Sequence, residues 1–357
     1  MKSILQWWVG YKLPLVHVKV DSGFKKVIAD FIYHPIKRRA ARLYVKLLQN
    51  FFGLKVIAVT GSAGKTSVKE TISSILRFTD QTIYSLDNID PVFNVPNTIL
   101  RCRPNTKYLV LEFGVEYPNE MDFYLWLVKP ETGVITNIFP THTLYFGDRQ
   151  GVFNEKKKLV ESTKFAVLNR TDEFLVTLKN KLKSKIVWFN SAKSFVDTNI
   201  NAAVAVAKIY KIKEAFIEKG VKGRETLSHR FSIIKHKSGA VIVDDTYNSN
   251  PEALIKSLEY FNKIAGKNKR TLVIGDMLEL GNLAEAEHIR IGKYLKKGNY
   301  QKIFGVGDLV KHITDDIYTT KSVVDELRKY LKPNTYIFLK GSRSTHLDTV
   351  VSQLVEI

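Results

Sequence analysis

From residue 55 onward, short apolar runs alternate with stretches in which apolar residues recur every three or four positions. A short apolar run is typical of a strand buried on both faces, and the longer spacing is typical of an amphipathic helix. The strands predicted first are Val56–Thr60, Tyr108–Phe113, Gly133–Asn137, Phe165–Asn169 and Lys185–Phe189. The helices predicted between them are Val68–Phe78, Glu120–Val128, Gly151–Glu161 and Thr171–Lys183. This alternation predicts a mostly parallel sheet covered by helices on both faces.

A second series of strands follows a polar passage. The helical pattern of Ile200–Tyr210 leads into residues 219–228, which are polar and contain glycine, and we expect a domain boundary there. The later strands predicted are Phe231–Lys235, Ala240–Asp244, Thr271–Gly275, Lys302–Val306 and Tyr336–Leu339. We therefore expect an α/β protein of three parts. They are a basic, aromatic and helical segment (residues 1–54), a central domain with the parallel sheet (residues 55–222) and a smaller Rossmann-like α/β domain (residues 223–357).

The N-terminal segment has a different pattern. Between Pro35 and Phe52 one set of apolar residues falls near helical spacing, with basic residues on the other side. This apolar set is Ile36, Ala40, Leu43, Leu47 and Phe51. Residues 1–54 contain ten lysines and arginines against two aspartates. Such a helix packs on its own domain, or it makes a peripheral contact with a membrane surface or an acidic partner protein.

Composition narrows the classes of function. The net charge is +20, but the lysines are spread along all 357 residues, as on a solvated surface, and no nucleic-acid partner is expected. The single cysteine, Cys102, excludes a disulfide framework and a cysteine zinc site. No segment has the run of about 18 apolar residues that a membrane span needs. A cytoplasmic protein is the expectation.

The stretch Gly61-Ser62-Ala63-Gly64-Lys65-Thr66 predicts a phosphate site. It lies between a predicted strand and a predicted helix, so backbone N–H groups and the positive end of the helix dipole converge on one anion. Lys65 adds a mobile positive charge, and the Thr66 hydroxyl is suited to Mg²⁺. The spacing is shorter than in the common loop because Val59 stands where the first glycine would be. We expect a nucleoside triphosphate to bind here.

Further polar residues follow other predicted strands. Glu112 ends the run Tyr108–Phe113, and His142 comes shortly after the strand Gly133–Asn137. The carboxyl ends of parallel strands meet at one edge of a sheet, so these two side chains are candidates for a Mg²⁺ shell. Each has a simpler interpretation as a helix cap or a loop histidine. Asp244 and Asp245 begin a second polar cluster, which otherwise reads as an Asx-type turn before a helix.

The motifs in this order resemble those of the Mur ligases, ATP-dependent enzymes that form amide bonds in cell-wall synthesis. The motifs are Thr60–Thr66, Leu111–Gly114 and Ile135–His142. Asp244–Pro251, Gly275–Gly281 with His288, and Lys340–Arg343 are similar to the branch that joins D-alanyl-D-alanine to a UDP-muramyl tripeptide. The resemblance runs from about residue 55 to the C-terminus. It implies that ATP phosphorylates a carboxylate and that an amine then attacks the acyl phosphate.

The resemblance also implies residue roles. Lys65, Glu112, His142 and Lys156 are the implied catalytic residues, with Thr66, Glu112 and His142 holding two Mg²⁺ ions. Lys156 matches a lysine that carries a carbamate, although two further lysines follow it. Asn201 matches an asparagine near adenine, and Arg230 and Asp245 match nucleotide contacts of the C-terminal domain. The implied contacts to the amino substrate are Asn248, Asn250, Lys340 and Arg343.

Departures from the family pattern keep the substrate open. Only the 54-residue segment precedes the phosphate loop, where the family has a domain for the UDP-sugar. Asn94 stands where glycine is typical, which a positive φ at this asparagine would allow. Lys158 replaces a usual glutamate. One alternative is a ligase of another acid–amine pair, as in the folylpolyglutamate and cyanophycin ligases. The other is a nucleotide-binding protein without ligase activity, anchored by its basic N-terminus to nucleic acid or a membrane.

Overall fold

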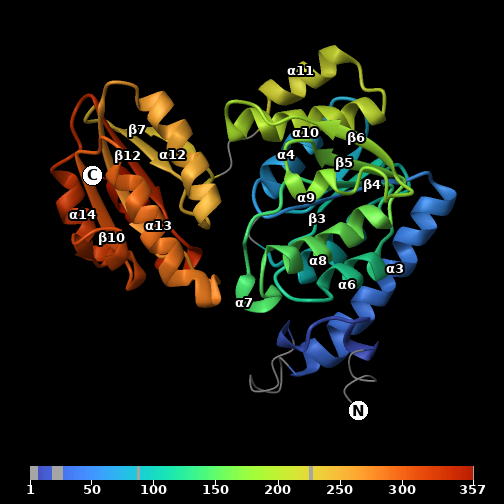
Figure 1. Ribbon diagram of the computed structural model, residues 1–357. Coiled ribbons are helices and arrows are strands. Elements are labelled where there is room, and N and C mark those ends of the chain that lie inside the picture. Colours follow the sequence, from blue (N-terminus) through green and yellow to red (C-terminus); the bar gives the residue numbers. More distant parts are fainter. Residues whose placement is uncertain (1–6, 18–26, 87–88, 225–227, 357) are drawn as a thin grey trace. The chain divides into compact units, whose positions relative to one another are not determined.

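The computed structural model describes residues 7–17, 27–86, 89–224 and 228–356, and these form two compact units (Figure 1). The N-terminal unit comprises residues 1–139 and 145–224, and the C-terminal unit comprises residues 140–144 and 225–357. Each unit has its own six-stranded sheet. Among the described residues, no helix is long and apolar enough to span a membrane.

The sheet of the N-terminal unit is entirely parallel, with the strand order β2-β3-β1-β4-β5-β6. Its strands are β1 (Lys55–Thr60), β2 (Thr82–Tyr84), β3 (Tyr108–Glu112), β4 (Thr132–Ile135), β5 (Phe165–Asn169) and β6 (Lys185–Phe189). β1 lies in the middle, paired with β3 on one side and β4 on the other. The carboxyl ends of β1, β3 and β4 therefore lie next to one another, and open α/β sheets bind ligands at the carboxyl ends of their strands.

Helices cover both faces of this sheet, and a separate buried apolar cluster lies under each layer. One layer is α4 (Lys65–Arg77), α10 (Phe195–Ile209) and α11 (Glu214–Lys222). The other is α3 (His34–Phe51), α5 (Pro91–Leu100), α6 (Glu120–Leu127) and α8 (Arg149–Glu161). Short helical turns are η1 (Leu15–His17), η2 (Ala29–Tyr33), α7 (Thr143–Phe146) and α9 (Glu173–Val176). The predicted two-sided parallel sheet is confirmed.

The C-terminal unit has the order β11-β10-β9-β12-β8-β7, with only β7 antiparallel. Its strands are β7 (Ser232–Lys235), β8 (Val241–Asp244), β9 (Lys269–Gly275), β10 (Lys302–Val306), β11 (Ile317–Tyr318) and β12 (Thr335–Lys340). Its helices are α12 (Pro251–Ala265), η3 (Gly281–Leu283), α13 (Ala284–Lys296), η4 (Leu309–His312), α14 (Thr320–Arg328), η5 (Arg343–Thr345) and α15 (Leu347–Glu356).

Some local predictions are wrong. The helix expected over Thr171–Lys183 is only the four-residue α9, because beyond Val176 the N–H groups bond to carbonyls three residues back. The two units divide after Arg224, within the predicted boundary passage, but the first part of that passage is the end of α11. There, Gly220 approaches α4 so closely that a Cβ would lie 2.4 Å from Ile75 Cα.

Asn94, which stands where the family pattern has glycine, does not have the positive φ that would explain a glycine there. It lies inside α5, a helix that begins at Pro91 with Asp90 as its N-cap. The Asn94 amide donates to the Leu86 carbonyl and its Oδ1 accepts from the Thr98 hydroxyl. Asn94 therefore contributes side-chain hydrogen bonds, and its helical backbone needs no left-handed conformation.

α3 presents to solvent the face that was expected to pack. Ile36, Leu43 and Phe51 are 54%, 69% and 79% exposed. The buried face lies opposite and consists of Pro35, Arg38, Ala41, Val45 and Leu48. The interpretation that the Ile36–Phe51 stripe packs on its own domain is therefore wrong, because a second face of the same helix fills that place.

Candidate active site

The phosphate loop follows β1 and requires glycine at two positions. Gly61 has φ +145° and Gly64 has φ +79°, values that residues with a Cβ rarely adopt. A Cβ on Gly61 would lie 1.9 Å from the Thr136 hydroxyl oxygen, and one on Gly64 would lie 2.5 Å from Asn199 Oδ1. The loop is therefore compressed between the end of β4 and the start of α10.

Residues after β4 hold this loop in shape. The Ser62 N–H donates to the Asn137 carbonyl, and the Ala63 N–H donates to Asn137 Oδ1. The Thr136 hydroxyl donates to the Ala63 carbonyl at 2.6 Å. Since the N–H groups of Ser62 and Ala63 are used in this way, the N–H groups of the first turn of α4 are the donors suited to an anion.

Lys65 and Thr66 begin α4, directly after the left-handed Gly64. Thr66 is buried, so its side chain lies inside the protein rather than on the surface of the loop. Lys65 lies close enough to Lys156 of α8 for its charge to lower the pKa of Lys156. Two of the implied catalytic residues are thus brought together from different helices.

Burial and charge set Lys156 apart from the lysines beside it. It is 1% exposed, and burial followed by the charge of Lys65 lowers its pKa to about 7. Lys157 is partly exposed and faces Glu161. Lys158 donates to Asp122 and Glu155, and these bonds raise its pKa despite burial. Only Lys156 among the three has the electrostatic setting of a reactive amine.

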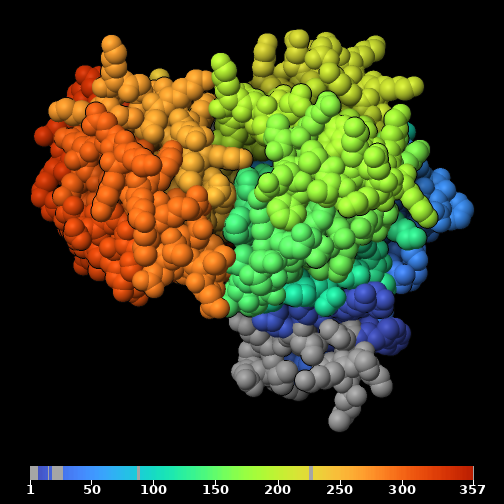
Figure 2. Space-filling model, in the orientation of Figure 1, coloured from blue at the N-terminus to red at the C-terminus, as the bar shows by residue number. Residues whose placement is uncertain are grey.

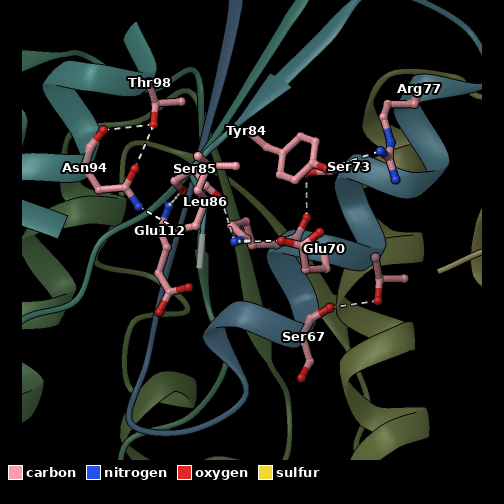
Figure 3. A network of polar contacts seen from close by, with 12 residues as sticks. Ser67, Glu70, Ser73, Arg77, Tyr84, Ser85, Leu86, Asn94, Thr98 and Glu112 are labelled. Carbon is pink, nitrogen blue, oxygen red and sulfur yellow. Dashed lines mark hydrogen bonds and ion pairs between the residues drawn. The ribbon is translucent and has the colours of Figure 1, made fainter. Parts of the chain in front are cut away.

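Glu112 ends β3 next to the phosphate loop (Figure 3). Its N–H donates to the Ser85 hydroxyl, while the Ser85 carbonyl accepts from Lys69, a fully buried lysine of α4 paired with Glu70 at 2.8 Å. Its carboxylate has no hydrogen-bond or ion-pair partner in the part of the chain that the structure describes. The strand end is fixed through its backbone, and the carboxylate remains available to a ligand.

His142 belongs to the C-terminal unit, whereas Thr66 and Glu112 belong to the N-terminal unit. Its Nδ1 lies 2.7 Å from Glu279 Oε2, and both residues have positive φ. The neighbouring Thr143 hydroxyl donates to the Leu280 carbonyl. Within its unit, His142 therefore sits on the Asp276–Gly281 loop that sequence motifs singled out.

A buried ion pair organises the cluster after β8. Asp245 Oδ2 lies 2.7 Å from Lys340 Nζ and accepts from the Ser257 hydroxyl. Lys340 also donates to the Asn248 carbonyl at 2.8 Å. Asn250 caps α12 by accepting the N–H of Ala253. The ion pair of Asp245 with Lys340 thus links the ends of the adjacent strands β8 and β12.

Both predicted arginines of this unit face one aromatic ring. The guanidinium carbon of Arg230 lies 3.7 Å from the centre of the Tyr247 ring, and that of Arg343 lies 5.3 Å from it. His288, by contrast, has a structural place: it is buried, accepts from the Met277 N–H and contacts the Ala284 carbonyl.

Two family profiles match this chain across both sheets. The Mur ligase middle domain matches residues 59–228, and the Mur ligase glutamate ligase domain matches residues 229–343. The chain belongs to the Mur ligase family. The resemblance inferred from its motifs is confirmed, and so is the α/β fold class.

Individual Mur ligases match over most of their length. A relative from Buchnera aphidicola subsp. Baizongia pistaciae is named UDP-N-acetylmuramoyl-tripeptide–D-alanyl-D-alanine ligase. It is 30% identical over 348 residues, which cover 84% of this chain and 75% of the relative. A crystal structure of MurF from Acinetobacter baumannii has a TM-score of 0.81 and 25% identity, covering 93% of this chain and 82% of that one. MurF from Thermotoga maritima in complex with ADP shares the fold, with a TM-score of 0.78, 21% identity and coverage of 90% and 83%.

Two residues of this Mur ligase were not singled out from the sequence. Asn199, rather than Asn201, lies against Gly64 of the phosphate loop, while the Asn201 amide donates to the Asn190 carbonyl. The second residue is Tyr247, whose ring contacts the guanidinium groups of both Arg230 and Arg343. The place of Tyr247 within the Asp244–Pro251 motif was an available signal, whereas the contact of Asn199 with Gly64 joins residues far apart in the chain.

The donor set suits a metal that is shared with a substrate. In the described residues no three His, Cys, Asp or Glu side chains cluster as a self-contained metal site. Mg²⁺ is usually held by one or two carboxylates together with substrate phosphates and water. The unpartnered Glu112 carboxylate, at the end of the strand that pairs with β1, fits that manner of binding.

Proposed function

We propose that this Mur ligase joins D-alanyl-D-alanine to a UDP-muramyl tripeptide at the expense of ATP. The substrate assignment rests on the 30% identity, spanning both domains, to a relative that is named for that reaction. ATP use is supported by the phosphate loop and by the ADP complex of a protein with the same fold.

The chemistry explains why the phosphate loop is needed. An amine does not displace hydroxide from a carboxylate at a useful rate. Transfer of the γ-phosphate to the carboxylate oxygen gives an acyl phosphate and ADP. The amine nitrogen then attacks the acyl carbon, the carbon–oxygen bond to phosphate breaks, and phosphate leaves with an amide formed. The enzyme has to hold several negative oxygens together and neutralise them.

In this proposal, Gly61–Thr66 bind the β- and γ-phosphates, chiefly through the first-turn N–H groups of α4 and the Lys65 ammonium. Thr66, Glu112 and His142 are the proposed Mg²⁺ ligands, and Mg²⁺ supplies charge neutralisation at the phosphates. Lys156, as its carbamate, is the proposed additional carboxylate for the metal. Asn201 keeps its proposed place near adenine.

The C-terminal unit is the proposed source of the remaining contacts. Arg230 and Asp245 are assigned to the nucleotide, and Lys340 and Arg343 to the amino substrate together with Asn248 and Asn250. The ion pair of Asp245 with Lys340 supports a positioning effect of these two residues on each other. Asn250, whose side chain caps α12, would act through its backbone position.

Phosphate release measured over a panel of acid–amine pairs tests the proposal. Purified protein with UDP-muramyl tripeptide, D-alanyl-D-alanine and ATP should release phosphate. The Lys65→Ala variant should lose about three orders of magnitude in turnover, whereas Lys157→Ala, at a partly exposed neighbour of Lys156, should retain it. Phosphate release only with folate or another acid–amine pair would overturn the substrate but keep the ligase. No release with any pair would overturn the ligase chemistry.

A further inference from the structure

The exposed face of α3 is a continuous apolar stripe on the surface of the N-terminal unit. It is formed by Ile36, Ala40, Leu43, Leu47 and Phe51. These residues recur at intervals of three or four, so they line one side of the helix over about 22 Å at about 1.5 Å per residue. Figure 2 shows atoms of α3, in blue, at the molecular surface. Four large side chains that are 44% to 79% exposed on one helix face are more than the scattered apolar residues of an ordinary surface.

Basic residues border this stripe on both sides. Lys46 and Arg39 follow one edge and Lys37 follows the other, and α3 contains no acidic residue. The segment of residues 1–54 as a whole carries a net charge of +8, from ten basic and two acidic residues. An apolar stripe with basic residues on both sides is complementary to a surface that carries negative charges on the outside and has an apolar layer beneath them.

Aromatic side chains lie at the N-terminal end of the same helix. Trp7 is 61% exposed, and Arg39 holds it by a hydrogen bond to its carbonyl and by a guanidinium contact to its ring. Tyr33, just before α3, is 55% exposed and contacts Lys37. Tryptophan and tyrosine prefer the headgroup layer of a bilayer, where one end is wet and the other apolar.

We propose that α3 docks this enzyme peripherally on an anionic lipid surface, with the Ile36–Phe51 stripe in the headgroup–acyl boundary and the flanking lysines at the headgroups. Interfacial helices have this combination of a polar basic border and an apolar face. A second copy of the chain is a poorer occupant, since two strongly basic stripes would repel each other. This role goes beyond the proposed ligase reaction, which α3 does not enter.

Co-sedimentation of the full chain with vesicles tests the docking. Vesicles of phosphatidylglycerol and phosphatidylcholine should bind the protein, pure phosphatidylcholine should bind it far less, and added salt should release it. Leu43→Glu with Phe51→Glu should lower the partition coefficient about 100-fold, since each buried side chain is worth at least about tenfold. The matched control Ile317→Glu with Val355→Glu, at exposed residues of the C-terminal unit, should bind like wild type.

Charge reversal gives an independent measurement. Lys37→Glu with Lys46→Glu should weaken binding at least about 25-fold, at about fivefold per basic residue near an anionic surface. Lys267→Glu with Lys321→Glu changes the net charge equally and should have little effect. Phosphate release by all variants in vesicle-free solution should match wild type, which separates docking from folding and catalysis.

Three results would overturn the proposal. The first is that the wild-type protein does not bind anionic vesicles, and the second is that the α3 variants bind them as well as wild type does. The third is that no vesicle binding occurs and sedimentation velocity instead finds a dimer or a protein complex that Leu43→Glu with Phe51→Glu dissociates. That last result would assign the stripe to a protein interface instead.

Discussion

Lys156 should form a carbamate with dissolved CO₂. An amine adds CO₂ only when uncharged: its nitrogen bonds to the carbon, one proton leaves, and a carboxylate replaces the ammonium. Burial and the charge of Lys65 lower the pKa of Lys156 to about 7, whereas an ordinary lysine has a pKa near 10.5. The surroundings therefore favour the form that reacts.

The size of the effect follows from the two pKa values. At about pH 7.5, roughly three quarters of the Lys156 side chains are uncharged, against about one in a thousand for an ordinary lysine. The reactive fraction is thus enriched by a factor on the order of several hundred. The product carries a negative charge beside the Lys65 ammonium, which replaces a repulsion by an attraction.

Carbon NMR in ¹³C-bicarbonate gives the direct assay. Wild type should show one carbamate resonance, Lys156→Arg should show none, and Lys157→Arg should keep it. Turnover should fall in CO₂-depleted buffer and recover on adding bicarbonate, and Lys156→Arg should be inactive at every bicarbonate concentration. A resonance that survives in Lys156→Arg, or an active Lys156→Arg enzyme, would refute the assignment.

A stability measurement separates this role from a structural one. Burying Lys156 without a carbamate costs between about 4 and 5 kcal/mol at neutral pH, because its pKa falls from 10.5 to about 7 at about 1.36 kcal/mol per unit. The unfolded chain binds more protons than the folded one between about pH 7 and 10.5, so this penalty shrinks as the pH rises. Compared with wild type in CO₂-depleted buffer, where Lys156 is an unmodified amine, Lys156→Met should therefore raise the free energy of unfolding at pH 7, measured by urea denaturation. The variant should also lose turnover at every bicarbonate concentration. A destabilised Lys156→Met would mean that the lysine supports the fold.

Three other perturbations test separate parts of the structure. Gly64→Ala should weaken ADP binding at least tenfold in calorimetry, because φ is +79° and the new Cβ would meet Asn199 Oδ1; unchanged affinity would contradict the loop geometry. Lys69→Met should lower the free energy of unfolding by about 3 kcal/mol, since it breaks a buried ion pair and frees the Ser85 carbonyl. His17 is partly buried, which lowers its pKa, but its bonds to two carboxylates outweigh this and raise the pKa to about 9. Its stabilising effect is therefore complete below pH 6.5 and is lost as the pH rises through 9. The difference in urea midpoint between wild type and His17→Gln should accordingly be large at pH 6 and small at pH 10, and a pH-independent difference would exclude this protonation.

The alternating pattern predicted most strands to within two residues, because most are short apolar runs. β1 and β5, which are buried on both faces, are examples. The N-terminal edge strand β2 and the proline-containing α5 were missed, since three residues give no periodicity and Pro96 argues against a helix. The helix expected over Thr171–Lys183 failed for the opposite reason: its spacing was helical, but the backbone turns more tightly after α9.

The sequence by itself determined the order of strands and helices, the glycine loop and the residues that follow each strand, since these depend on neighbours in the chain. Tertiary structure decided what depends on burial and on distant partners. It separated Lys156 from Lys157 and Lys158, because only Lys156 among these three is buried beside the Lys65 ammonium, which lowers its pKa. It placed Asn199 against Gly64, and it turned the Ile36–Phe51 stripe of α3 outward. Periodicity reveals an apolar face, but only the packed structure shows whether anything covers it.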